Sequence, residues 1–138
     1  MVTPSKNVLE IGCGLGWVTN SIAYNYNKKV LGLDFNPHAV EIAQSVAKKL
    51  QLQSEFLCDD LFSFSQEKSD TKDFYDLIIS LGVLHHTDDC IGAIKSICNN
   101  ILKKKGYFFV GLYHRYGREP FLKYFDDLKN LIYLRKNY

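Results

Sequence analysis

A short apolar run followed by alternating glycines constrains this chain more than any other stretch. Residues 8–11 read Val-Leu-Glu-Ile, and Gly12, Gly14 and Gly16 follow at every second position before a helical pattern begins near Val18. An apolar run of this length is typical of a buried parallel strand. Glycine lets the backbone turn tightly and lets a ligand approach the main chain. Strand, glycine turn and helix in this order predict a nucleotide-binding βα unit.

The spacing of the glycines indicates which ligand the turn accepts. A dinucleotide-binding turn reads Gly-x-Gly-x-x-Gly around a pyrophosphate, but here Trp17 stands at the third glycine position and Gly16 comes one residue early. Glu10 stands two residues before Gly12, and a carboxylate there disfavours a phosphate and favours a cationic or amine-bearing ligand. The turn therefore disfavours NAD as the ligand, and with it an NAD-dependent oxidoreductase.

Strand patterns alternate with helical patterns along the rest of the chain. Strands are expected at 29–34, 54–58, 74–81 and 107–113, and helices at about 16–26, at 37–50 and, capped by Thr87-Asp88-Asp89, up to a stop at Gly106. Asn27 can end the first helix in a left-handed conformation, and Asn36-Pro37 is an N-cap followed by proline at the first position of the second helix. We expect residues 63–73 to form a surface loop with one helical turn, Lys103 to Lys105 to be a solvated helix C-terminus, and Glu119-Pro120 to open a last helix. The alternation predicts an α/β fold with a parallel sheet and helices on both faces.

Length and composition limit the class of protein. A chain of 138 residues fits one domain, and 46% hydrophobic residues are ordinary for a globular core. The net charge of +2 comes from scattered basic residues, and no apolar run approaches the roughly 20 residues of a membrane span. The four cysteines fit no Cys-x-x-Cys zinc pattern and are expected to be small apolar filler in a reducing compartment. We expect a cytoplasmic protein without a metal, nucleic-acid or membrane partner.

Two strand ends carry residues that suit a ligand. Asp34 ends the second expected strand twenty residues after Gly14, where a βαβ unit places a carboxylate over a ribose; a helix-capping acid is the alternative. Phe35 beside it suits an adenine ring. His85 and His86 follow the fourth strand, but adjacent loop histidines rarely ligate one metal ion and no third ligand accompanies them. Three roles stay open for the two histidines: general base, orientation of the methyl acceptor, and packing in the pocket wall.

Four stretches in this order resemble the class I S-adenosylmethionine (SAM) dependent methyltransferases, and the last resembles their UbiE-like, or type 11, branch. The stretches are Glu10 to Gly16, Leu31 to Asn36, Phe56 to Leu61 and Tyr75 to His86. The family often has glycine where Cys58 stands, and it usually shows Leu-Lys-Pro-Gly-Gly where this chain has Leu-Lys-Lys-Lys-Gly at Leu102 to Gly106. The resemblance covers about Val8 to Leu112.

This resemblance implies a doubly wound, Rossmann-like sheet of strand order 3-2-1-4-5 and transfer of the SAM methyl group to a small-molecule acceptor. It implies that Asp59 accepts the adenine amino group and that the next N–H, of Asp60, donates to the ring. His85 or His86 would be the catalytic base, with Tyr113 and His114 as further candidates. The implied cofactor contacts are Glu10, Gly12, Cys13, Gly14, Gly16, Asp34, Phe35, Asn36, Asp59, Asp60, Leu61 and Leu81.

A non-catalytic SAM-binding domain, or an inactive fragment, is the alternative from another class. Complete family members have two further strands and often N-terminal helices that cover the pocket. We expect residues 1–138 to be a single SAM-binding core that lacks those last two strands. The strand at 107–113 would then be a sheet edge that favours self-association.

Overall fold

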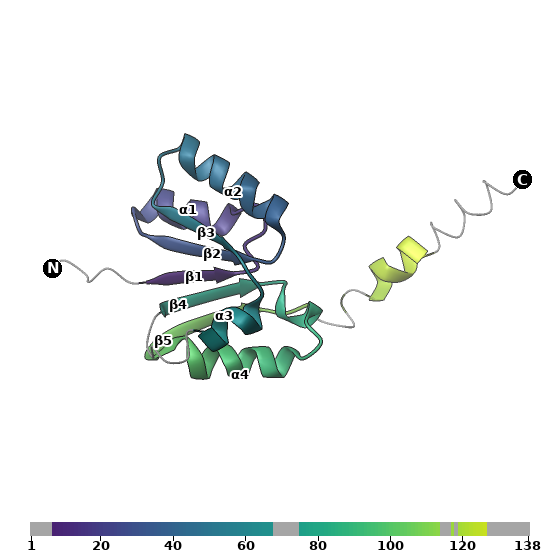
Figure 1. Cartoon of the computed structure of the whole chain (residues 1–138). Coiled ribbons are helices and arrows are strands. Elements are labelled where there is room, and N and C mark those ends of the chain that lie inside the picture. The colour runs from purple at the N-terminus through teal and green to yellow at the C-terminus, as the bar shows by residue number, and fades with distance from the viewer. Residues whose placement is uncertain (1–6, 68–74, 114–116, 118, 127–138) are drawn as a thin grey trace, which may run out of the picture.

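The computed structural model describes residues 7–67, 75–113, 117 and 119–126. The described residues up to 113 build one parallel sheet between two helical layers (Figure 1). The strands are β1 (Val8–Ile11), β2 (Val30–Asp34), β3 (Ser54–Cys58), β4 (Tyr75–Leu81) and β5 (Leu102–Gly111). The helices are α1 (Trp17–Tyr26), α2 (Pro37–Lys49), α3 (Leu61–Glu67), the short 3₁₀ helix η1 (Leu84–His86) and α4 (Cys90–Asn100). The strand order β3-β2-β1-β4-β5 confirms the predicted topology.

The helices that connect the parallel strands divide between the two faces of the sheet. α1 and α2 lie on one face and α3 and α4 on the other (Figure 1). Ala23 of α1 packs with Val8, Val30 and Ile79 of the strands. On the other face, the core joins side chains of the strands to those of α3, η1 and α4: Leu9, Ile11, Leu33, Ile78, Phe64, Leu84, Ala93, Ile97 and Ile101. Both faces of the central strand β1 are therefore buried, as the apolar run predicted.

Local sequence signals fix the ends of the first two helices. Asn36 accepts hydrogen bonds from the N–H groups of His38 and Ala39, and Pro37 occupies the first turn of α2. Asn27 ends α1 in the left-handed conformation, with φ of 48°. These three features were predicted from the sequence and are confirmed.

The loop expected at 63–73, with one helical turn, is more helical than predicted in its first part, because α3 runs from Leu61 to Glu67. The Asp60 carboxylate accepts hydrogen bonds from the N–H groups of Phe62 and Ser63 and caps this helix. Phe64 is 2% exposed in the core under α4. One buried aromatic side chain and one cap thus make a helix of a polar stretch; residues 68–73 lie outside the described part.

The expected end of the fourth helix at Gly106 is also wrong. α4 ends at Asn100, and β5 begins at Leu102, so Lys103 to Lys105 lie in a strand and not at a helix C-terminus. The side chain of Ile101 is fully buried at the junction. Lys103 Nζ lies 3.0 Å from the Asp76 carboxylate on the neighbouring strand. The register between β4 and β5 shifts where these lysines lie, which accommodates the charged run at the sheet edge.

A further helical segment follows β5. Gly117 and residues 119–126 are helical, which confirms the helix expected from Glu119; its expected continuation through Leu128, Leu131 and Ile132 lies outside the described residues. The segment stands away from the sheet and its two helical layers (Figure 1). Within the part of the chain that the structure describes, no helix has the length and apolar character needed to cross a membrane.

Candidate functional site

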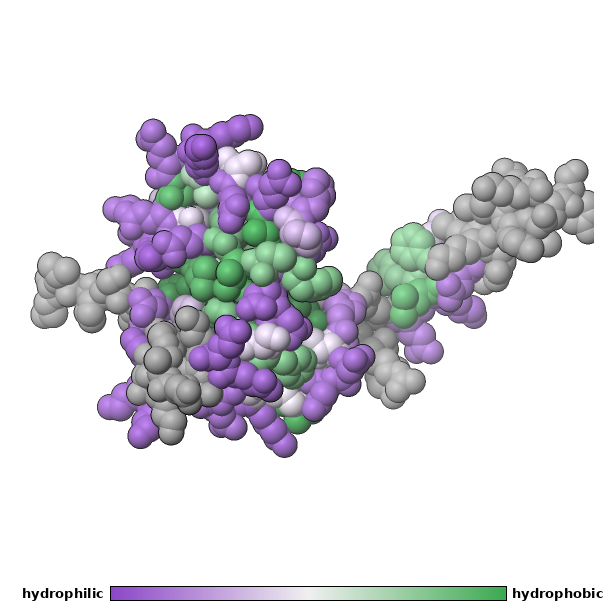
Figure 2. Space-filling view, viewed as in Figure 1, coloured by the Kyte–Doolittle hydropathy of each residue, from purple (hydrophilic) through white to green (hydrophobic). Residues whose placement is uncertain are grey.

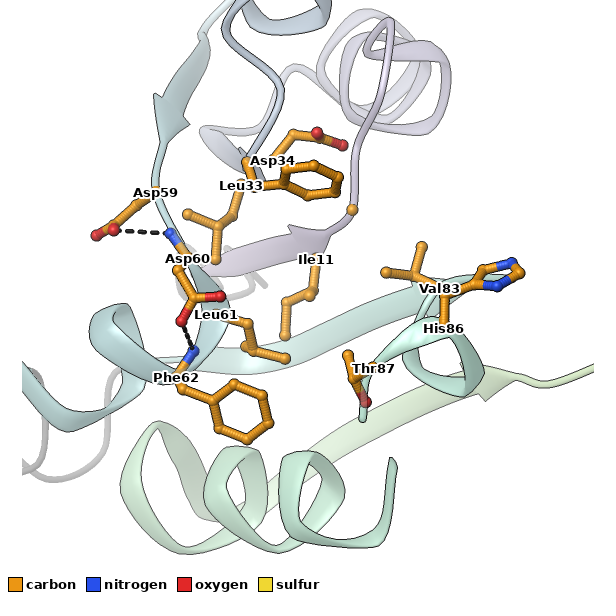
Figure 3. Close-up of a pocket in the computed structure, with 12 residues that line it drawn as sticks. Ile11, Leu33, Asp34, Asp59, Asp60, Leu61, Phe62, Val83, His86 and Thr87 are labelled. Atoms are coloured by element: carbon orange, nitrogen blue, oxygen red, sulfur yellow. Dashed lines mark hydrogen bonds between the residues drawn. The ribbon is translucent and has the colours of Figure 1, made fainter. Parts of the chain in front are cut away.

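A pocket opens where the carboxyl ends of β1, β2, β3 and β4 meet, the usual ligand position in a doubly wound sheet. Its walls come from the loops after these strands: Ile11, Gly12, Leu33, Asp34, Phe35, Asp59, Asp60, Leu61, Phe62, Val83, His86 and Thr87. Figure 3 shows Asp59 and Asp60 on one side of the pocket and Val83 and His86 on the other. The topology therefore brings together residues that are far apart in the sequence.

The three glycines of the loop differ in what surrounds them. A Cβ added to Gly12 would collide with the side chain of Val83, and one added to Gly16 would stand 2.8–2.9 Å from Ala43 and Phe56. A Cβ added to Gly14 would meet no protein atom within 4 Å. Gly14 has φ of +50°, which side chains rarely tolerate. Packing therefore explains the first and third glycines, whereas the second borders open space.

Asp34 ties the glycine loop to the start of α2. Its Oδ2 accepts a hydrogen bond of 2.8 Å from the N–H of Gly14, and its Oδ1 accepts one of 2.9 Å from the N–H of Asn36. The residue is 9% exposed and lines the pocket. Each carboxylate oxygen has two lone pairs, so both oxygens retain the capacity to accept a ligand hydroxyl. Phe35, beside it in the pocket wall, is 80% exposed.

Glu10 lies behind the loop and is bound to the first turn of α1. Its Oε2 accepts hydrogen bonds from the N–H of Thr19 at 2.8 Å and from its hydroxyl at 2.5 Å. Gly16, the residue before the helix, has no side chain to cap it, so Glu10 satisfies an N–H that a capping residue would ordinarily bind. Burial raises the pKa of the Glu10 carboxyl, the Thr19 bonds lower it in part, and nearby Asp34 raises it.

Cys13 is also placed for structure. The residue is buried among side chains of α2 and β3. Burial, with Glu10 and Asp34 nearby, raises the pKa of the Cys13 thiol to about 12. The thiol is therefore protonated near neutral pH and is a poor nucleophile.

The two aspartates after β3 accept hydrogen bonds from N–H groups of their own turn and of the helix that follows. The N–H of Asp60 donates to the Asp59 carboxylate at 2.7 Å, while the Asp60 carboxylate caps α3 (Figure 3). Leu61 is buried in the pocket floor. Of the other expected contacts, Asn36 caps α2, and Leu81 ends β4 outside the pocket wall, 44% exposed.

An aromatic cluster flanks the pocket at the ends of β4 and β5. The ring centroids of His85 and His86 are 4.0 Å apart, and those of His85 and Tyr113 are 4.4 Å apart. Tyr113 lies over Gly82, whose added Cβ would stand 2.9 Å from the phenol oxygen. Three of the four base candidates are thus brought together, with His86 lining the pocket; His114 lies outside the described residues.

Sequence reasoning missed some of the pocket wall. Val83 lies within the fourth matched stretch and Thr87 directly follows it, but neither was predicted to be a site residue. The Thr87 hydroxyl instead donates to the carbonyl of Leu84, and Asp89 caps α4. Phe62 follows the acidic turn and had no signal of its own. Among the described side chains, no group of three or more histidines, cysteines or acids is placed to hold a metal ion.

Comparison with known proteins assigns the chain. A family model described as a methyltransferase domain matches residues 3–129. The chain belongs to this family. The class I resemblance of its motifs is thereby confirmed, and the sheet order is that of the methyltransferase fold.

Curated relatives of this methyltransferase domain are longer than the chain itself. A ubiquinone biosynthesis O-methyltransferase of Coxiella burnetii is 26% identical over 110 residues, which are 80% of this chain and 44% of that protein. A protein named as a protein N5-glutamine methyltransferase of Methanocaldococcus jannaschii is 41% identical over 58 residues, which are 42% of this chain and 29% of that protein. The chain spans less than half the length of these relatives.

Solved structures share the fold. The PH0226 protein of Pyrococcus horikoshii OT3 superposes with a TM-score of 0.72 at 22% identity, over 88% of this chain and 56% of that one. Coclaurine N-methyltransferase, solved with N-methylheliamine and SAH, gives a TM-score of 0.65 at 22% identity, over 79% of this chain and 31% of that one. At these identities the likeness establishes the fold.

Proposed function

We propose that this methyltransferase domain binds SAM at the pocket beside the glycine loop and transfers its methyl group to a small-molecule acceptor. The observation that carries the proposal is the backbone conformation of Gly14 and the open space beside it. Its backbone is left-handed, and open space stands where a Cβ would be, while its N–H is bound to the pocket acid Asp34. A ligand that lies against the main chain explains why this position has no side chain.

The residues around the pocket suit the chemical groups of SAM. Asp34 would hold the ribose hydroxyls, with Phe35 along the adenine and Leu61 beneath it. Asp59 would accept the adenine amino group, which frees the N–H of Asp60 for the ring. The loop residues Gly12, Cys13 and Gly16 would shape the turn, together with Glu10 behind it, and Asn36 and Leu81 would complete the contacts. The fit rests on the kind of hydrogen bond each group makes, because the described pocket lining offers carboxylates and neither lysine nor arginine for a phosphate.

The methyl-transfer step asks little of the protein. Bound SAM supplies a methyl group already activated on a sulfonium, so positioning of the acceptor is the main remaining requirement. The pocket-facing His86 would accept, at an imidazole nitrogen, the proton that the acceptor loses. The ring of His85, tilted by 50° against both His86 and Tyr113, would orient that imidazole.

A SAM-binding core with low activity of its own is the second candidate. It is favoured by the exposure of His86, since an open site does not exclude water. We also propose a reducing compartment, such as the cytoplasm, because all four cysteines are free thiols.

Methyl transfer from labelled SAM to a mixed metabolite extract tests the proposal. We expect the purified chain to label a small-molecule fraction, and the His86→Ala variant to retain SAM binding while losing labelling. SAM binding without labelling by either protein would favour the binding core. The absence of SAM binding would contradict both candidates.

A further inference from the structure

The turn after β4 is shaped to hold an aromatic ring. Gly82, at this turn, has φ of +72°, a left-handed conformation that favours glycine. Its N–H donates a hydrogen bond of 2.8 Å to the carbonyl of Gly111 at the end of β5. A Cβ added to Gly82 would stand 2.9 Å from the hydroxyl oxygen of Tyr113 and 3.2 and 3.5 Å from two of its ring carbons. The backbone conformation and the Tyr113 ring thus both exclude a side chain at this position.

Tyr113 lies against the two histidines of η1. Its ring centroid is 4.4 Å from that of His85, and the ring of His86 lies 4.0 Å from that of His85. The rings of His86 and Tyr113 stand edge to face at 80°, with their centroids 6.3 Å apart. Aromatic rings at these separations attract one another in tilted and edge-to-face arrangements. His85 is therefore the ring that contacts both of the others.

The backbone of η1 is fixed by contacts that leave the His86 side chain free to turn. Leu84 is fully buried, and its carbonyl accepts a hydrogen bond of 2.7 Å from the Thr87 hydroxyl. The N–H of His86 donates to the carbonyl of Val83 at 2.9 Å. These contacts place His86 beside the pocket that it lines (Figure 3). The residue is exposed, so the rings that its imidazole meets decide the direction of that imidazole.

We propose that Tyr113 is a positioning residue for the methyl transfer: its ring, seated on Gly82, supports His85 and through His85 sets the direction of the His86 imidazole. The inference rests on the proposed function, in which His86 accepts the proton of the acceptor. Tyr113 is not among the described residues that line the pocket. It therefore acts through the histidines and not on the cofactor.

Tyr113 can be replaced without opening the core. The residue is 53% exposed. The helix at 119–126, which follows it in the chain, stands clear of the sheet and its two helical layers (Figure 2), so this helix does not cover the ring. A half-exposed ring at the end of a sheet contributes less to stability than a fully buried one. A loss of activity in a Tyr113 variant therefore reports on the site and not on unfolding.

Nuclear magnetic resonance of the purified chain tests the geometry without any acceptor. The chain has four histidines, so single histidine-to-glutamine variants assign the imidazole signals. We expect a nuclear Overhauser contact between the imidazole protons of His85 and His86 in the wild type and in Tyr113→Phe, which keeps the ring. Tyr113→Ala should lose most of this contact while remaining folded by circular dichroism.

Methyl transfer from labelled SAM to the metabolite extract tests the consequence. Tyr113→Ala should lower the initial labelling rate about 10-fold, part of the roughly 100-fold or more that a positioned base contributes. The dissociation constant of SAM, measured by calorimetry, should not change. The double variant Tyr113→Ala, His85→Ala should label no more slowly than His85→Ala alone, because Tyr113 acts through His85. A separate contribution of Tyr113 to acceptor binding would instead make the two losses multiply.

Tyr107→Ala is the matched control, because Tyr107 is a 69% exposed tyrosine on β5, the strand that leads to Tyr113. This variant should keep both the histidine contact and the labelling rate. A His85–His86 contact that survives in Tyr113→Ala would overturn the inference, as would multiplied losses in the double variant. Absence of labelling by the wild type would contradict the proposed methyl transfer instead, and the resonance measurement would still decide whether Tyr113 positions His86.

Discussion

At the scale of single residues, the glycine loop combines packing with ligand access. Val83 excludes a side chain at Gly12, and Ala43 and Phe56 exclude one at Gly16. Of these three glycines, only Gly14 has open space where a side chain would stand. The left-handed backbone and the proposed ligand explain why this position has no side chain. The loop therefore allows a substitution that leaves the protein core intact and fills the proposed site.

Replacing Gly14 by Asn should abolish SAM binding in a folded protein. Asn tolerates the left-handed conformation better than other side chains, and its atoms would occupy the space that is now open. Calorimetry with SAM, and thermal melting to verify the fold, check this outcome. Normal affinity in the variant would make the turn purely structural.

Replacing Asp34 by Ala should weaken SAM binding about 10- to 100-fold, the effect of losing a charge-assisted hydrogen-bonded pair of roughly 1.5–3 kcal/mol. The variant should also melt earlier, because the N–H groups of Gly14 and Asn36 lose their acceptor. Asp34→Asn keeps one side-chain oxygen and should be intermediate in both respects. If a folded Asp34→Ala protein keeps the wild-type dissociation constant, the ribose binds elsewhere.

Replacing Glu10 by Gln should change how stability depends on pH. Burial raises the folded-state pKa of Glu10 above its ordinary value of 4.5, so the folded state holds this proton more tightly than the unfolded state does. The Glu10 contribution is full below pH 4.5 and is lost as pH rises through the folded-state pKa. Gln keeps an acceptor for Thr19 without ionising. Urea unfolding should be measured from below pH 4.5 to above the folded-state pKa of Glu10. The variant should gain stability relative to wild type as pH rises. A difference in unfolding free energy that does not change with pH would contradict the raised pKa.

At the scale of elements, the sequence predicted those that its strongest local signals determine. The apolar run at β4, the Asn36-Pro37 start of α2 and the left-handed Asn27 all specify structure over a few residues. The errors fell where tertiary contacts decide. Phe64 holds α3 in the core. Leu102 and Tyr107 pair with β4, so the lysines between them lie in β5; neither contact has a local signature.

The cap of α4 gives a stability test at this scale. Asp89 Oδ1 accepts a hydrogen bond of 2.8 Å from the N–H of Gly92, and Asp89→Ala should lower the free energy of unfolding by about 1 kcal/mol. Asp88→Ala is the matched control, since it removes a neighbouring acid that is not the cap. Urea denaturation measures both. Equal losses in the two variants would mean that charge, and not capping, is responsible.

At the scale of the whole molecule, the sheet order and the gathering of the motif residues followed from the alternation of strands and helices. Parallel strands bring their carboxyl ends to one edge, so Gly12, Asp34, Asp59 and His86 meet although they span much of the chain. The orientation of side chains could not be predicted in this way. Glu10 turned out to cap α1 from behind the loop, and its contact with Thr19 depends on how the helix packs on β1.

The most direct test of the account is calorimetric titration of the purified chain with SAM and, separately, with NAD. The glycine spacing, the open space at Gly14 and the carboxylate of Asp34 predict saturable binding of SAM at one site and no heat of binding with NAD. Saturable binding of NAD without binding of SAM would contradict the central claim.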